Sequence, residues 1–322
     1  MDDGSLLRVD QRTTAVPGLR TSRSRGVRST HLIGWSTHLI GWLFVAPALV
    51  VYAAFVLLPL ALSVQYSLYR WDGIGPSEWV GLKNYAVVLT DPDLVGVILN
   101  AFKLILFFSL IPVGLGLIVA SVMRRIAGGR FGTVTRTVLF LPQIIPLVAA
   151  GIAWKWVLSS SGLVNQVLSA IGLDGVTRAW LGDFDFALPA VGIIGAWVLI
   201  GLCTILLLTG MSKIDIALYE SARLDGAGAV QEFRSITLPS LRQEIGVCIT
   251  VTVIAALASF DIVYVATGGG PGLSTTVPGL DIYQLAFAGR QVGLASALAV
   301  VLFILVLVCV LPIQRLARGD QT

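Results

Sequence analysis

This 322-residue chain contains several long apolar stretches, and each is long enough to cross a lipid bilayer. A membrane-spanning helix needs about 20 consecutive, mostly apolar residues. Only 12% of the residues are charged, whereas soluble domains contain about 25%, so a water-soluble globule could not cover its surface with them. The sequence therefore predicts an all-α integral membrane protein. Its six spans are expected at about 40–66, 97–122, 134–157, 187–210, 243–267 and 291–314.

The first apolar stretch is long enough for two helices, but its N-terminal part contains polar residues and is interpreted as a lead-in to one helix. Six spans are therefore favoured, and five or seven are the alternatives. Its N-terminal part repeats the heptad STHLIGW, at 29–35 and 36–42, and contains the only histidines, His31 and His38. A tandem duplication at the membrane interface explains the repeat. A pH sensor or a metal-binding pair is the alternative, although two ligands do not complete a metal site.

Basic residues indicate which side of the membrane each connection faces. Most of the 22 lysines and arginines lie before the first span, in the second and fourth loops, and after the last span, whereas the other loops are acidic. Because cytoplasmic loops are enriched in Lys and Arg, both termini are expected in the cytoplasm. Residues 1–38 form a basic N-terminal tail, 39–316 the six-helix membrane domain and 317–322 the C-terminal tail. The basic tail either sets the topology alone or also contacts anionic lipid.

Several kinds of chemistry have no motif in the chain. There is no phosphate-binding GxxxxGK[ST] loop, and the glycine cluster 268–272 follows a span and contains Pro271, which argues against a nucleotide cradle. The three cysteines are far apart, so neither a disulfide framework nor a zinc site is indicated. Ionisable residues within the spans are few, which argues against a proton-coupled carrier. The sequence predicts no enzyme activity, no cofactor and no nucleic-acid partner; any transport would use energy from another subunit.

The connection between the fourth and fifth spans, residues 211–242, is the most informative loop. Residues 214–224 are helix formers, Gly226 can take the left-handed conformation that ends a helix, and residues 229–237 resume a helix. Small residues leave a slim surface that could enter a groove of another protein. The loop is therefore predicted to be a cytoplasmic helix–turn–helix that docks on a partner.

The motif Glu-Ser-Ala-x-x-Asp-Gly-Ala, from Glu220 to Ala227 and followed by Leu238-Pro239, resembles the EAA loop of binding-protein-dependent ABC importer permeases. Ser221 stands where that family usually has alanine. The segment Thr267-Gly-Gly-Gly-Pro271 is similar to carbohydrate-type permeases of the MalF kind. The resemblance extends from about residue 40 to 315, and it implies a type I ABC importer permease fold with a cytoplasmic coupling helix.

The resemblance also implies a function and partners. Such a permease forms half of a translocation pathway for a sugar or related polyhydroxylated solute in the prokaryotic plasma (inner) membrane, and glycerol phosphate or a polyol is the alternative cargo. Its expected partners are a second, MalG-type permease, an extracytoplasmic binding protein and an ABC ATPase dimer, which binds the ATP and Mg. The ATPase-coupling positions that match the family are Glu220, Ser221, Ala222, Asp225, Gly226, Ala227, Leu238 and Pro239.

Polar residues of the fifth span are the candidates for the solute pathway. Thr252 and Ser259 are seven residues apart and share a helical face with Ala256. They either face a water-filled pathway or form interhelical hydrogen bonds. Asp261 either binds solute, caps a helix or pairs with the partner, and Tyr264 completes the pathway set. A stand-alone channel, a secondary carrier or a membrane-embedded enzyme are the competing classes, and none of them would bind a soluble ATPase.

Overall fold

The computed structural model describes residues 33–126 and 129–317. It consists of two compact units, one ending at Leu57 and one beginning at Leu58, which we describe separately. Most of the predicted basic tail, His31 and nearly all of the predicted C-terminal tail lie outside the described residues.

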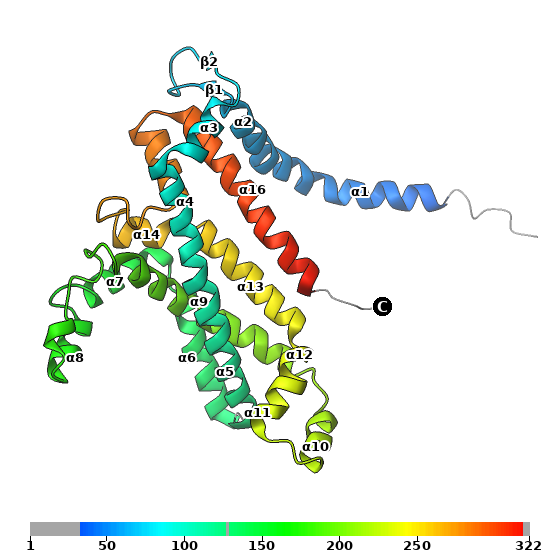
Figure 1. Cartoon of the computed structure of the whole chain (residues 1–322). Coiled ribbons are helices and arrows are strands. Elements are labelled where there is room, and N and C mark those ends of the chain that lie inside the picture. The colour runs from blue at the N-terminus through cyan, green and yellow to red at the C-terminus, as the bar shows by residue number, and fades with distance from the viewer. Residues whose placement is uncertain (1–32, 127–128, 318–322) are drawn as a thin grey trace, which may run out of the picture. The chain divides into compact units, whose positions relative to one another are not determined.

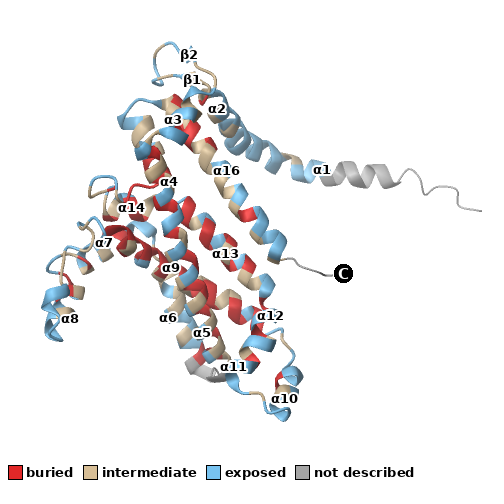
Figure 2. Ribbon diagram, in the orientation of Figure 1, coloured by how far each residue is buried: buried red, intermediate tan, exposed pale blue. Residues whose placement is uncertain are grey.

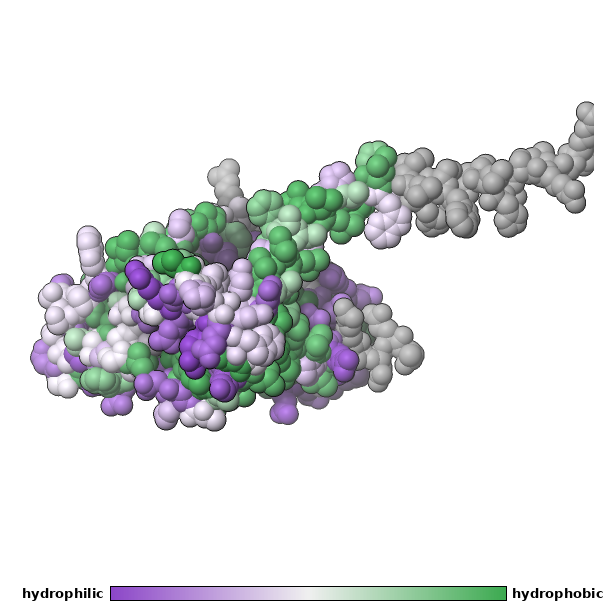
Figure 3. All heavy atoms as spheres, turned by 90° about the horizontal axis from the view of Figure 1, so that it is seen from above, coloured by the Kyte–Doolittle hydropathy of each residue, from purple (hydrophilic) through white to green (hydrophobic). Residues whose placement is uncertain are grey.

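The first unit is one apolar helical rod. It comprises α1 (Ile33–Tyr52) and the π-helical segment η1 (Ala53–Leu57). The candidate span Trp42–Tyr66 begins in this unit, and none of its most apolar part is buried by protein. Figure 3 shows the drawn part of this rod as mostly hydrophobic. A helix that is apolar on all sides and uncovered by protein is suited to a lipid environment.

The second unit contains the remaining spans and their connections (Figure 1). Its first half comprises α2 (Leu58–Tyr66), the antiparallel hairpin of β1 (Tyr69–Arg70) and β2 (Glu78–Trp79), α3 (Lys83–Thr90), α4 (Pro92–Ile105), the π-helical η2 (Leu106–Leu110), α5 (Ile111–Ile126), α6 (Gly129–Ile144) and α7 (Leu147–Val157). The middle comprises α8 (Leu163–Ala170), the 3₁₀ turn η3 (Asp174–Val176) and α9 (Ala187–Met211).

The C-terminal part comprises α10 (Ile216–Leu224), α11 (Ala229–Glu232), the π-helical η4 (Phe233–Thr237), α12 (Leu238–Ser240), α13 (Arg242–Leu257), α14 (Asp261–Ala266), α15 (Pro278–Tyr283), the π-helical η5 (Gln284–Ala288) and α16 (Val292–Ala317). Helices α5, α6 and α13 pack around α9, and α16 packs on α13. Within the described residues, four helices are long and apolar enough to span a membrane, and up to six if each of two bent helix pairs is one span.

Two predicted spans are broken rather than continuous. The expected span 134–157 is divided into α6 and α7, with a bend of 97°. Pro146 explains this break, since proline lacks an N–H and disfavours helical backbone in the preceding residue. The expected span 243–267 is interrupted at residues 258–260, between α13 and α14. This second break contains neither proline nor glycine, so it has no local signal in the sequence.

Helix α9 is the centre of the second unit, and most of its residues are buried (Figure 2). Its glycines allow neighbouring helices to approach closely. A Cβ atom at Gly201 would overlap the backbone carbonyl oxygen of Leu139 on α6. A backbone atom cannot move aside as a flexible side chain can, so this crossing of α6 and α9 requires glycine.

Residues 159–186, which we call the 159–186 arm, connect α7 to α9 and are held together by one buried side chain. The Asn165 amide nitrogen donates to the carbonyl oxygens of Ser159 (3.2 Å), Ser160 (3.0 Å) and Arg178 (2.8 Å). Its amide oxygen accepts from the indole of Trp180 at 2.8 Å and from the backbone N–H of Arg178 at 3.4 Å. The arm is therefore an ordered loop rather than a loose connection.

The loop between α14 and α15 is held by a second buried asparagine. The Asn100 amide of α4 donates to the carbonyl oxygens of Leu273 (3.2 Å) and Thr276 (3.0 Å). Asp281 on α15 is buried, and its Oδ2 atom has no hydrogen-bond partner. Burial, together with the nearby carboxylates of Asp91 and Asp93, raises the pKa of Asp281.

Candidate functional site

The predicted docking loop forms the helix–turn–helix that its sequence indicates. Asp215 caps α10 by accepting a hydrogen bond from the backbone N–H of Ala217 at 2.9 Å. After α10 ends, Gly226 has a φ of +82°. Its N–H donates to the Arg223 carbonyl at 3.0 Å, and the Ala227 N–H donates to the Ala222 carbonyl at 2.8 Å. This pair of bonds is a Schellman motif, which ends a helix at a left-handed glycine.

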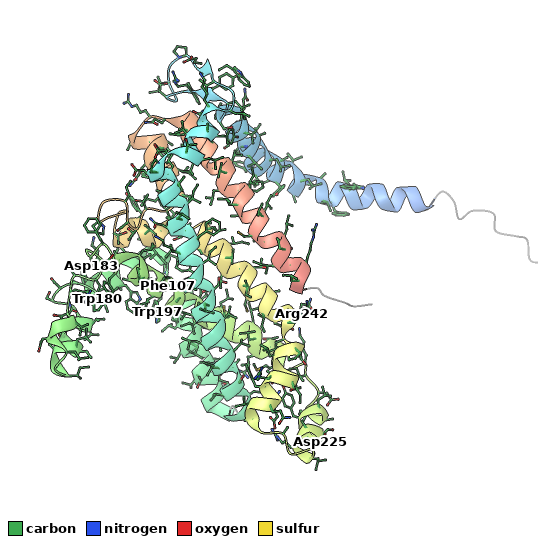
Figure 4. The ribbon with its side chains drawn as sticks, in the orientation of Figure 1. Phe107, Trp180, Asp183, Trp197, Asp225 and Arg242 are labelled. Atoms are coloured by element: carbon green, nitrogen blue, oxygen red, sulfur yellow. The ribbon has the colours of Figure 1, made fainter. Side chains whose placement is uncertain are left out.

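One face of α10 is uncovered by the rest of the protein. Glu220 is exposed, and Leu224 on the same face is 89% exposed. The Ser221 hydroxyl donates to the Ala217 carbonyl at 2.9 Å, so it needs no external partner. Asp225 lies at the tip of the loop, at the end of the second unit opposite the β1–β2 hairpin (Figure 4). This face is a mixed apolar and acidic surface that extends beyond the helical bundle.

Another face of α10 is fixed to the bundle. Tyr219 is buried, its hydroxyl lies 2.9 Å from the Thr237 hydroxyl, and the Arg124 guanidinium lies over its ring. Arg223 donates from Nε to the buried Glu232 carboxylate at 2.8 Å, which raises the pKa of Arg223.

Leu238 and Pro239 belong to α12, directly before a 71° bend into α13. Pro239 occupies the first turn of α12, a position that tolerates the absence of an N–H. Arg242, labelled in Figure 4, begins α13. The structure therefore places these two predicted residues where the loop re-enters the bundle.

The two breaks in the predicted spans face a common cavity of about 520 Å³. The α6–α7 break contributes Gln143 and Pro146, and the α13–α14 break contributes Ser259, Phe260 and Asp261. The Gln143 side-chain oxygen is buried there and lacks a hydrogen-bond partner. The cavity thus combines apolar walls with a few polar groups, which is the usual composition of a small-molecule site.

The structure separates the residues predicted to line a solute pathway. Thr252 is fully buried and donates to the Ser109 hydroxyl at 2.8 Å. It therefore forms an interhelical hydrogen bond, which is the second of the two alternatives stated for it. Ala256 belongs to the apolar core and does not line the cavity. Ser259 and Asp261 do line it. Thr252 and Ala256 lie on the part of α13 that packs on α4, η2 and α9, which keeps both of them away from the cavity.

Tyr264 lies in an aromatic cluster beside the second break. Its ring stacks on Phe260 at 5.3 Å with an interplanar angle of 11°, and it meets Tyr283 edge-on at 5.8 Å. Tyr264 remains 48% exposed. This stacked pair, of which Phe260 is partly buried and Tyr264 exposed, offers apolar ring surface next to the polar groups of the cavity.

Sequence reasoning missed the polar residues inside the second and third spans. Asn100, Ser109 and Gln143 are the side chains that organise the loop, the helix contact and the cavity. The sequence could have indicated them, since each is a polar residue in an otherwise apolar stretch. Among residues 33–126 and 129–317, no group of three or more His, Cys, Asp or Glu side chains could hold a metal ion.

Comparisons with known proteins agree with this architecture. A family model for the "Binding-protein-dependent transport system inner membrane component" matches residues 113–318. A probable ABC transporter permease protein of Bacillus subtilis is 36% identical over 267 residues, which are 82% of this chain and 91% of that protein. A trehalose/maltose transport system permease protein of Thermococcus litoralis is 34% identical over 271 residues, or 82% and 89% of the two chains.

A solved structure has the same fold. A bacterial alginate ABC transporter, crystallised with an alginate pentasaccharide-bound periplasmic protein, contains a chain that superposes with a TM-score of 0.72 at 24% identity. The match covers 89% of this chain and 97% of that one. The predicted permease fold is thereby confirmed. This chain belongs to the family of binding-protein-dependent transport system inner membrane components, and it is a multi-pass permease subunit of an ABC transporter.

Proposed function

We propose that the chain forms half of the solute pathway of an ATP-driven importer for a sugar or a related polyhydroxylated solute. The observation that carries this proposal is the cavity at which both broken helices meet. Gln143, Ser259 and Asp261 supply hydrogen-bonding groups there, and the Phe260–Tyr264 pair supplies apolar ring faces alongside. Hydroxyl groups and the C–H faces of a sugar need these two kinds of surface. The trehalose/maltose relative supports the same solute class.

The uncovered face of α10 is proposed to dock on an ABC ATPase dimer, which binds the ATP and Mg. Glu220 would pair with a basic residue of the ATPase, and the Asp225–Ala227 turn would set the direction of the helix. Two facts support this role: the face is exposed, and the rest of α10 is fixed to the bundle by Tyr219. The remaining partners are a second, homologous permease and an extracytoplasmic binding protein, of which the alginate structure gives a precedent.

The proposed orientation places α10 and both termini in the cytoplasm, because the connections at that end are rich in arginine and lysine. Single cysteines can test it. A cysteine at the exposed Ser235, in the same loop but outside the α10 docking face, should react with a membrane-impermeant maleimide only from the cytoplasmic side, and one at the exposed Asp185 only from outside. Labelling of Asp185→Cys from the cytoplasm would reverse the proposed topology.

The docking role is tested by purifying the tagged chain from its native membrane and identifying the proteins that accompany it. We expect an ABC ATPase and a second permease with the wild type, and loss of the ATPase with Glu220→Lys. Asp185→Lys is the matched control, since it makes the same charge change at an exposed carboxylate on the other side of the protein. Equal ATPase recovery from both variants would rule out Glu220 as a docking residue.

The solute is tested in proteoliposomes that contain the whole importer and its binding protein. Competition by unlabelled sugars, polyols and glycerol phosphate identifies the cargo class. Uptake that only glycerol phosphate inhibits would replace the sugar proposal by its alternative. Uptake that needs no ATP would contradict the importer mechanism itself.

A further inference from the structure

The contact between Arg124 and Tyr219 joins two elements that are far apart in the sequence. Arg124 lies at the C-terminal end of α5, in the second span, and Tyr219 lies on α10. The guanidinium carbon is 3.6 Å from the centroid of the tyrosine ring. At this distance a cation is attracted by the electron density of the ring face, and more strongly where water is excluded. Tyr219 is only 3% exposed, so the ring is well shielded.

The same ring is also held from a third element. The Tyr219 hydroxyl lies 2.9 Å from the Thr237 hydroxyl, which is buried at the end of η4, just before the short helix α12 that leads into α13. One side chain of α10 therefore contacts both the second span and the entry to the fifth span.

Little other packing supports the contact with α5. A cavity of about 300 Å³ lies beside it, and its walls include Ile118, Ser121, Arg124, Tyr219, Phe233 and Thr237. Because this space holds no protein atoms, α10 is not joined to α5 by a continuous apolar core. The Arg124–Tyr219 contact bridges elements that the cavity otherwise separates.

We propose that Arg124 is a positioning residue that ties the second span to α10, so that a displacement of α10 is transmitted to α5 as well as to α13. This inference rests on the proposed docking of α10 on an ATPase. Arg124 does not contact the ATPase in this scheme, since the docking face of α10 points away from Tyr219. Its loss should therefore leave the ATPase bound while ATP hydrolysis no longer moves the second span.

The test measures ATP hydrolysis and solute uptake in the same proteoliposomes, for the assembled importer. Arg124→Gln removes the cation, and Tyr219→Leu removes the ring. Each should raise the number of ATP molecules hydrolysed per solute by up to about thirtyfold, the factor that corresponds to the upper range of a cation–ring contact. ATPase recovery should remain at the wild-type level. The double variant should be no worse than Tyr219→Leu alone, because Arg124→Gln removes only the cation–ring contact that Tyr219→Leu already lacks, whereas Tyr219→Leu also loses the bond to Thr237.

Conservative variants separate positioning from folding. Arg124→Lys keeps the cation and Tyr219→Phe keeps the ring, so both should stay near the wild-type ratio. Arg315→Gln is the matched control, because it removes an exposed arginine at the end of α16. A wild-type ratio in Arg124→Gln, or effects of Arg124→Gln and Tyr219→Leu that multiply in the double variant, would overturn the inference. Absence of ATP-dependent uptake in both the wild type and Arg315→Gln would instead overturn the proposed function on which it rests.

Discussion

Replacing Gly226 with valine tests whether the turn after α10 depends on left-handed backbone. Gly226 has a φ of +82°, and a Cβ atom there would meet no heavy atom within 4 Å. The cost of a side chain is therefore backbone strain alone, with no steric overlap and no compensating contact. An L-residue in left-handed backbone costs about 1–2 kcal/mol, and a β-branched residue lies at the upper end. Since about 1.4 kcal/mol is a factor of ten, the correct turn should become about five- to thirtyfold less populated relative to its open forms.

Hydrogen exchange of the whole importer measures this change where it occurs. The N–H groups of Gly226 and Ala227 donate the two bonds that close the turn, so the loop peptide that contains them should exchange faster by the same factor. The midpoint of thermal unfolding should stay unchanged, because the turn lies outside the apolar core. The turn in Gly226→Asn should exchange more slowly than in Gly226→Ala or Gly226→Val, since asparagine tolerates left-handed backbone.

Gly228 provides a matched control in the same loop. It has the same open surroundings, but its φ is −78° and its ψ is 169°, which is extended backbone that valine readily adopts. Gly228→Val should leave the exchange of the turn nearly unchanged. Equal exchange in Gly226→Val and Gly228→Val would refute the assignment of the cost to left-handed backbone.

Three further perturbations test the bundle itself. Gly201→Ala should lower stability by about 1–3 kcal/mol, measured as the thermal midpoint in detergent, whereas Gly114→Ala, in open surroundings on α5, should not. Asn100→Leu removes the donors to the buried Thr276 carbonyl and to the Leu273 carbonyl, costs about 1–3 kcal/mol, and should speed hydrogen exchange at residues 267–277; unchanged exchange would contradict the proposed anchor. Burial raises the pKa of Asp281 above its ordinary value of 3.8, so between pH 3.8 and the raised pKa the native state binds more protons than the unfolded state. Stability therefore falls as pH rises through that interval. Asp281→Asn should remove this part of the decline, and thermal midpoints near pH 3.8 and at neutral pH measure it.

The sequence was sufficient for the features that follow from local chemistry. The positions of most spans follow from apolar length alone, since a helix in lipid needs only enough apolar residues to cross it. The turn at Gly226 was likewise predictable, because few residues other than glycine take a left-handed φ without strain. The EAA-like motif then placed the candidate docking face on an exposed helix, as the structure has it.

The features set by tertiary contacts could not be derived in the same way. Nothing in residues 258–260 marks a helix break, and only the packing of α13 shows that Thr252 turns toward Ser109 instead of the cavity. The partners of Asn100 are more than 170 residues away in sequence. A polar residue in an apolar stretch indicates that some partner exists, but the choice between a solute and another helix is made by the fold.

The Asn165 side chain has a consequence for engineering the 159–186 arm. A carboxamide of this length offers both donors and acceptors, and Asn165 uses both kinds at once. Aspartate would lose the donors, and leucine would lose every bond. By contrast, residues 172–176 beside it are all exposed. An epitope or a fluorophore inserted there should leave the amide's partners in place, so the arm can carry a reporter of transport provided that position 165 is left unchanged.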